Sequence, residues 1–259
     1  MLGLDGFLEA FGVTALIGAA FSLGAGGFTK GVVGFALPLV ALSAMASFLP
    51  YETALALLIL PTLVSNVLQA LRNGLDAAMT SLRRYWRLVL FTCIMIAVSA
   101  QLVVALPDAF FFALLGITIT LFGLSQSFGW QPRLPDHHLE RVETGVGLVA
   151  GFFGGISGVW GPPVVMYLIA RHIPKAEMVR VQALVYGVGS VILTLAHSKS
   201  GVLNNVTLPV SFWLILPTMA AMFLGYKVQD RLDQAVFRKV TLWVLVAAGL
   251  NLLRRAAFG

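Results

Sequence analysis

The chain has 259 residues, of which 59% are hydrophobic and 11% are charged, with a mean hydropathy of +0.92. Soluble domains carry about 25% charged residues, so this composition excludes a soluble globular protein and predicts an all-α integral membrane protein. The formal net charge of +6 fits basic cytoplasmic loops, and no aromatic side chains interleave with a basic groove, so we expect no nucleic-acid binding.

Apolar segments follow one another along the chain, with short polar connections between them. At about 20 residues per spanning helix, the length accommodates about eight to ten membrane helices and no separate soluble domain. Asp5 and Glu9 precede the first basic residue, Lys30, which is the wrong charge for a signal peptide, so we expect the first segment to be retained. We expect these segments at residues 8–28, 32–49, 51–71, 86–106, 109–129, 143–159, 162–172, 178–197, 207–226 and 236–253.

The two halves of the chain resemble each other. Gly24–Pro38 corresponds to Gly151–Pro163, and Arg72-Asn-Gly74 corresponds to Lys199-Ser-Gly201. The first residues of both pairs are separated by 127 positions. A constant offset between separated landmarks indicates a duplicated unit. We predict a first transmembrane repeat at 1–130, a cytoplasmic connection at 131–142 and a second transmembrane repeat at 143–259.

Each repeat is expected to contain a Gly-rich helical hairpin, broken or re-entrant, followed by three transmembrane helices. If the N-terminus lies outside the cell, three of the 17 Lys and Arg residues fall on the outer side: Lys199, Arg254 and Arg255. The others fall on the cytoplasmic side, except Lys30 if it lies within the membrane. Corresponding loops of the halves then lie on opposite sides of the membrane. This is the inverted-topology arrangement of many secondary transporters.

The stretch from Gly24 to Pro38 interrupts an apolar run with one lysine, several glycines and a proline. An ionisable side chain at membrane depth costs about 3 kcal/mol on insertion scales and by default marks a functional position. We expect helix N-termini after Gly31 and Gly161 to direct free N–H groups at an anion between them. The substrate-binding residues that this predicts are Lys30, Thr29, Gly26, Gly27, Gly31, Ser157, Gly158, Trp160 and Gly161, with Asn66, Gln69, Gln182 and Tyr186 as candidate pocket lining.

Each of these residues also has a structural explanation. The glycines are equally the residues of close-packed helix faces, and Lys30 has a stem long enough to reach a cytoplasmic boundary. Trp160 is as well suited to an interfacial anchor as to a pocket wall. Hydrogen bonds between helices alone explain the polar side chains at positions 66, 69, 182 and 186, and we favour that explanation slightly.

Two stretches resemble the paired signatures of the TauE/SafE family of membrane permeases, also called the sulfite exporter family. They are Gly31-Val-Val-Gly-Phe-Ala-Leu-Pro-Leu-Val40 and Gly155-Ile-Ser-Gly-Val-Trp-Gly-Pro-Pro-Val-Val-Met-Tyr167. The likeness extends to the length, the duplicated halves and the polar connection. Many members carry glycine where this chain has Ala36 and Trp160. The resemblance implies transport of sulfite, sulfonates or sulfoacetate, and leaves the substrate and the direction open.

We therefore predict a secondary transporter for a small anion in the inner membrane of a bacterium, working by alternating access between two inverted repeats. The histidines and Cys93 lack the spacing of metal ligands, and no catalytic constellation is present, so we expect no metal, no cofactor and no enzymatic activity. The proton-motive force is the expected driver, although no carboxylate stands out as a proton carrier. A passive anion channel and a non-transporting scaffold subunit remain alternatives.

Overall fold

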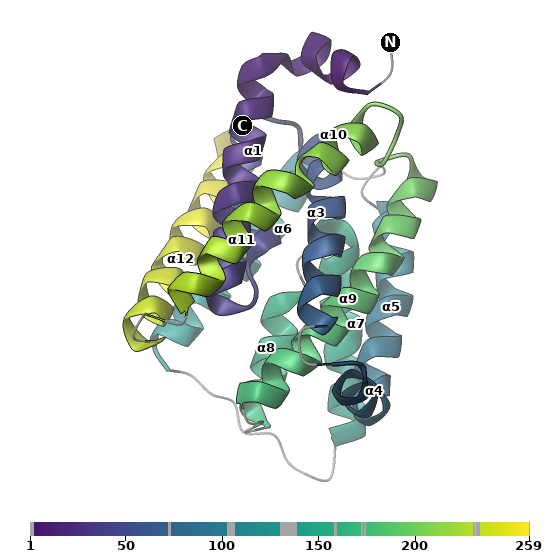
Figure 1. Ribbon diagram of the computed structural model, residues 1–259, viewed down its shortest axis with the longest axis vertical. Coiled ribbons are helices and arrows are strands. Elements are labelled where there is room, and N and C mark those ends of the chain that lie inside the picture. Colours follow the sequence, from purple (N-terminus) through teal and green to yellow (C-terminus); the bar gives the residue numbers. More distant parts are fainter. Residues whose placement is uncertain are drawn as a thin grey trace.

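The residues described by the computed structural model are 3–71, 74–102, 107–129, 139–157, 160–171, 173, 175–229, 231 and 234–258, and they contain helices and no strands (Figure 1). The all-α prediction is therefore confirmed. The helices are α1 (Leu4–Val33), α2 (Leu37–Met45), α3 (Tyr51–Leu71), α4 (Leu75–Arg84), α5 (Trp86–Ser99), η1 (Ala100–Leu102), α6 (Asp108–Ser127), α7 (Leu139–Ser157), α8 (Gly161–Ala170), α9 (Lys175–Ser200), α10 (Thr207–Trp213), α11 (Ile215–Gln229) and α12 (Gln234–Phe258).

Both Gly-rich hairpins consist of one long arm and one short arm. α1 has 30 residues, with a kink at Gly12, and α7 has 19. Their partners α2 and α8 have 9 and 10 residues, which gives lengths of about 14 and 15 Å, half the thickness of a hydrocarbon core of about 30 Å. A short arm therefore cannot cross a bilayer, and both hairpins have the dimensions of re-entrant elements.

One predicted boundary was wrong. A helix N-terminus was expected after Gly31, but α1 continues to Val33 and the next helix begins at Leu37. The connection predicted at 131–142 falls mostly outside the described residues, which lack 130–138, and α7 begins at Leu139. A glycine within a helix lowers the stability of the helix but does not by itself end it. The first arm therefore continues through the apolar residues Val32 and Val33.

The packing of the helices repeats between the halves. The long arm α1 packs along α11, and the long arm α7 packs along α5, so each hairpin contacts the opposite half of the chain (Figure 1). α3 pairs with α9, and α6 pairs with α12. α6 begins at Asp108 and α12 at Gln234, 126 residues later. Pairing of these long helices with the opposite half is what two-fold related repeats produce.

Glycines form the seams between these helix pairs. Gly27 and Gly31 lie four residues apart on α1, where a Cβ atom would overlap the backbone of α11 at Thr218 and Met222. Gly147, Gly151 and Gly155 repeat the same spacing on α7 and contact the backbone of α5 and its continuation in the same way. Small residues at a four-residue spacing let membrane helices approach closely, so these glycines serve helix packing.

By length and apolar composition, four helical stretches of the described residues qualify as membrane spans: Leu4–Val32, Tyr51–Leu71, Arg180–Ser200 and Thr207–Val228. α4 and α5 together qualify as a fifth, bent by 82° at Tyr85. The polar connection expected between the segments at 51–71 and 86–106 therefore contains a helix, α4. The polar and charged residues Asp76, Thr80, Arg83 and Arg84 give this stretch the composition of a connection.

The seam between α1 and α11 yields a prediction about stability. Gly31→Ala should lower the free energy of unfolding by about 1–3 kcal/mol, because the added methyl group forces the two backbones apart. Gly24→Ala is the matched control on the same helix, since its Cβ would lie 4.0 Å from the Cβ of Ala221. Thermal unfolding of the two purified variants measures the difference, and equal stability would show that the seam is loosely packed.

Candidate functional site

Each hairpin is interrupted between its two arms: the first break lies between α1 and α2, and the second break lies between α7 and α8. The two breaks meet at one small cavity. Its walls come from both breaks and from the polar faces of α3 and α9. The volume open to the centre of a water molecule is about 20 Å³, enough for a water and too small for a sulfur oxyanion. The residues that line it are Lys30, Phe35, Ala36, Pro38, Leu39, Asn66, Trp160, Gly161 and Tyr186.

Lys30 is the charged residue of this cavity. Its side chain is only 2% exposed, and its Nζ donates a hydrogen bond to Oδ1 of Asn66 on α3. The alternative in which Lys30 extends into cytoplasmic water is therefore wrong. The lysine also stands in the last turn of α1, where its positive charge stabilises the negative end of the helix dipole.

The first break is a tight reversal with one strained residue. The Gly34 N–H donates to the carbonyl oxygen of Lys30 at 2.7 Å, with Gly34 in the left-handed region at φ 84°. Ala36 is also left-handed, at φ 79°, a conformation that costs a non-glycine residue about 1–2 kcal/mol. Strain of this kind persists where the surroundings over-determine the backbone, and it concentrates at functional sites.

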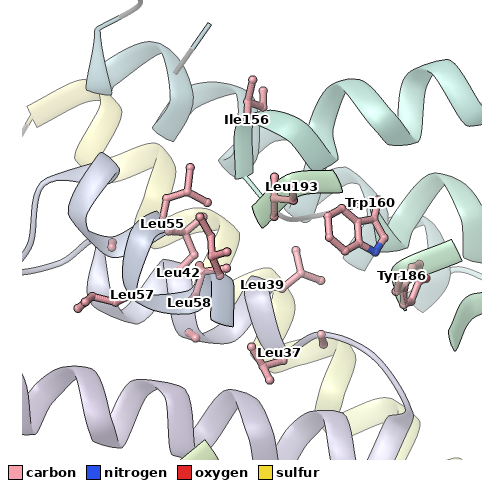
Figure 2. Packing of buried hydrophobic residues seen from close by; sticks show 14 of the residues in the cluster. Leu37, Leu39, Leu42, Leu55, Leu57, Leu58, Ile156, Trp160, Tyr186 and Leu193 are labelled. Atoms are coloured by element: carbon pink, nitrogen blue, oxygen red, sulfur yellow. The ribbon is translucent and has the colours of Figure 1, made fainter. Parts of the chain in front are cut away.

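The second break brings two aromatic rings to the cavity. The ring centroids of Trp160 and Tyr186 lie 6.0 Å apart, and Figure 2 shows the two side chains next to each other, with Leu39 between Trp160 and the leucine cluster of the first half. Tyr186 Oη donates to the Gly161 carbonyl at 3.4 Å. A Cβ on Gly161 would lie 3.9 Å from the ring of Phe35, so the two breaks are in near contact.

Helix α3 supplies the polar wall between the breaks. Asn66 Nδ2 donates to the carbonyl oxygen of Tyr186 at 3.1 Å, which links α3 to α9. One turn further along, Gln69 Nε2 donates to the Gly34 carbonyl at 2.7 Å. The Gln69 Oε1 atom is buried without a hydrogen-bond partner. Asn66 thus both accepts from the buried ammonium and fixes the position of the opposite repeat.

Hydrogen bonds that the sequence did not predict hold the second hairpin. His197 is fully buried, and its Nε2 lies 2.8 Å from the carbonyl oxygen of Gly155, so this nitrogen carries the proton. Tyr51 Oη donates to the carbonyl of Ile156 at 2.5 Å. Both acceptors belong to the last turn of α7. A lone histidine and a tyrosine at a helix start give no sequence signal for such contacts.

The structure brings some of the predicted residues together and separates others. Lys30, Asn66, Trp160, Gly161 and Tyr186 line the cavity. Gln69 does not line it and instead donates to the Gly34 carbonyl between α1 and α2. Gly158 lies outside the described residues, as does the side chain of Ser157. Other predicted residues do not line the cavity. Gly26, Gly27 and Gly31 are helical and face neighbouring helices. The Thr29 hydroxyl donates to the Ala25 carbonyl at 2.8 Å, and Gln182 is buried on α9.

Comparison with known proteins identifies the family of this chain. The profile of the family described as "Sulfite exporter TauE/SafE" matches residues 17–252. The chain is 25% identical over 253 residues to a protein of Cupriavidus necator named "Probable sulfite/organosulfonate exporter TauE", an alignment that covers 92% of this chain and 93% of that protein. No solved structure matches the chain. The chain therefore belongs to the sulfite exporter TauE/SafE family, and it is a multi-pass transporter of small anions in the bacterial inner membrane rather than an enzyme.

Proposed function

We propose that this transporter carries a sulfur oxyanion or an organosulfonate and binds it in the cavity beside Lys30. The observation that carries this proposal is a buried ammonium group, bonded to a neutral amide, at the point where two broken hairpins meet. Among the described residues that line the cavity, none is acidic. The ammonium therefore has hydrogen-bonding capacity and charge that the protein leaves for a ligand.

Electrostatics favours an anionic ligand at this position. Removing a charge from water costs several kcal/mol unless an opposite charge replaces the lost hydration. Asn66 Oδ1 satisfies only one of the three N–H groups of an ammonium and none of its charge. An oxyanion in the cavity supplies both a negative charge and several acceptor oxygens. Binding therefore reduces the cost that Lys30 imposes on the empty protein.

The backbone adds donors from both breaks. The first N–H groups of a helix have no partner in the helix, and those of Leu37 and Leu39 stand at the start of α2. At the start of α8 the prolines at 162 and 163 lack an N–H, so Gly161 supplies the N–H there. With the indole N–H of Trp160, these groups are all donors, a composition suited to an oxyanion.

The size of the cavity supports a moving site. A volume of about 20 Å³ holds a water and not an anion with three oxygens, so the two breaks must separate when substrate enters. We propose that the short arms α2 and α8 move, because several glycine contacts hold the long arms against α11 and α5, whereas α2 has one such contact with α1, at Gly26. Movement of one break at a time would expose the site to one side of the membrane, which is alternating access.

The substrate class rests on the family and on the wall of the cavity. The Cupriavidus necator relative is named for sulfite and organosulfonates, and both present oxygens on sulfur to a positive group. Phe35, Leu39, Trp160 and Tyr186 give the cavity apolar lining in addition to the ammonium. An organosulfonate would direct its sulfonate at Lys30 and its carbon portion at these side chains.

Lys30→Met tests the binding site directly. Methionine fills a similar volume without charge, so the variant should fold while sulfite-dependent thermal stabilisation and sulfite flux in proteoliposomes fall at least about tenfold. Lys199→Met is the matched control because Lys199 is exposed in the last turn of α9 and does not line the cavity. Wild-type stabilisation and flux in Lys30→Met would refute the site. Flux without counterflow in the wild-type protein would indicate a channel instead.

Asn66→Leu should destabilise the substrate-free protein by about 1–3 kcal/mol, because the ammonium loses its acceptor and the Tyr186 carbonyl loses its donor. Thr62→Val is the matched control one turn away on α3, since the Thr62 hydroxyl is buried without a partner. Denaturant unfolding of both variants measures the difference. If both variants were as stable as the wild type, Asn66 would not be the group that compensates for the buried charge.

Trp160→Leu should separate organic from inorganic substrates. Loss of the indole surface is expected to weaken sulfoacetate or taurine binding by about tenfold and sulfite binding by less than about threefold, since only the former have carbon atoms to bury. Trp213→Leu is the control, because Trp213 is 58% exposed on α10. Competition against sulfite uptake gives both affinities, and equal losses would show that the indole does not contact the carbon portion.

A further inference from the structure

Helix α4 presents three distinct faces. Ala78, Ser81 and Tyr85 are buried against the protein, mainly against α9. Leu75 and Met79, on an adjoining face, are 73% and 51% exposed. The remaining face is polar and ends in two arginines. A helix with an exposed apolar stripe next to an exposed polar face is typical of elements that lie in the interface of a membrane.

The corner that follows α4 places the helix at the membrane boundary. The chain bends by 82° at Tyr85 and continues as apolar α5, which packs along α7. If α5 runs across the bilayer, α4 lies nearly in its plane. Trp86 begins α5 and is 47% exposed, which is the position where tryptophan anchors membrane proteins. Figure 1 shows α4 at the end of the molecule opposite to the N-terminus.

The basic residues of this corner differ in their partners. Arg84 pairs with Glu177 of α9 at 2.8 Å, and Arg87 pairs with Glu140 of α7 at 3.1 Å. Arg83 is exposed and forms no ion pair with any described residue. A planar guanidinium beside an exposed apolar stripe matches the phosphate and the acyl chains of one phospholipid.

We propose that the α4 corner binds an anionic phospholipid of the cytoplasmic leaflet, with its phosphate on Arg83 and its acyl chains along Leu75 and Met79. Charge complementarity favours an anionic lipid, because no described residue forms an ion pair with the Arg83 guanidinium and the cytoplasmic leaflet is rich in anionic headgroups. A zwitterionic lipid offers the same acyl chains without the net charge. Each basic residue near such a surface favours anionic lipid by about fivefold.

This lipid would act on the transport machinery through two ion pairs. Arg84 ties α4 to α9, which carries Tyr186 of the cavity, and Arg87 ties α5 to α7, which leads to the second break. A lipid that holds the corner in place therefore supports the half of the site formed by these helices. Loss of the lipid is expected to loosen both ion pairs together.

Thermal unfolding in mixed micelles tests the proposal. Dioleoyl phosphatidylglycerol should raise the melting temperature of the wild-type protein more than dioleoyl phosphatidylcholine, and 0.5 M NaCl should reduce the difference. Arg83→Gln should lose at least half of this difference. Lys199→Gln, the same change of charge on an exposed lysine at the other end of α9, should keep it. Met79→Gln should weaken the effect of both lipids.

An equal response of Arg83→Gln and wild type would overturn the proposal, as would equal stabilisation by the two lipids. Light scattering of the same samples gives the mass of the protein particle. If Arg83→Gln changes that mass, a second copy of the chain covers this face, and the lipid assignment is wrong. These measurements do not involve substrate, so they test the lipid site independently of the anion site.

Discussion

The burial of one ammonium group is the constraint on which the rest of this structure depends. Lys30 lies near the end of the candidate span Leu4–Val32 and is 2% exposed, and the protein offers it an amide oxygen and no carboxylate among the described lining residues. Such a group is costly to maintain, and the cost is tolerated when the charge is needed in one state of a working cycle. The broken hairpins, the polar face of α3 and the strained Ala36 all surround this one side chain.

The glycines explain how the two halves reach each other. Close approach of α1 to α11 and of α7 to α5 places each hairpin inside the opposite half, so that both breaks meet at the same cavity. Bulkier residues at these seams would separate the halves and open a gap between the breaks. The four-residue spacing of glycine thus positions the site without contacting it.

Much of the site could be predicted from the sequence because a lysine among apolar residues has few structural explanations. Lys30, Trp160 and Gly161 stood out in the interrupted stretches, and they line the cavity. Asn66 and Tyr186 also line it, although hydrogen bonding between helices was the favoured explanation for them. The glycines at 27 and 31 were expected to expose N–H groups, although their four-residue spacing already indicated a packing face. The sequence shows where helices are weakened, but packing decides whether they break. His197 gave no periodic or compositional signal of its role, and the helical spacing of Leu75, Ala78, Met79 and Leu82 in α4 was not used as one.

Binding of a heavy analogue of sulfite would show directly whether an anion binds in the cavity beside Lys30. Selenite has the charge and shape of sulfite, and its anomalous scattering locates it in a crystal of the protein. We expect one selenium peak between Ala36 and Gly161, within about 4 Å of Lys30 Nζ, the reach of a charge-assisted hydrogen bond to a selenite oxygen. A peak away from both helix breaks, with Lys30 still bonded to Asn66, would contradict it.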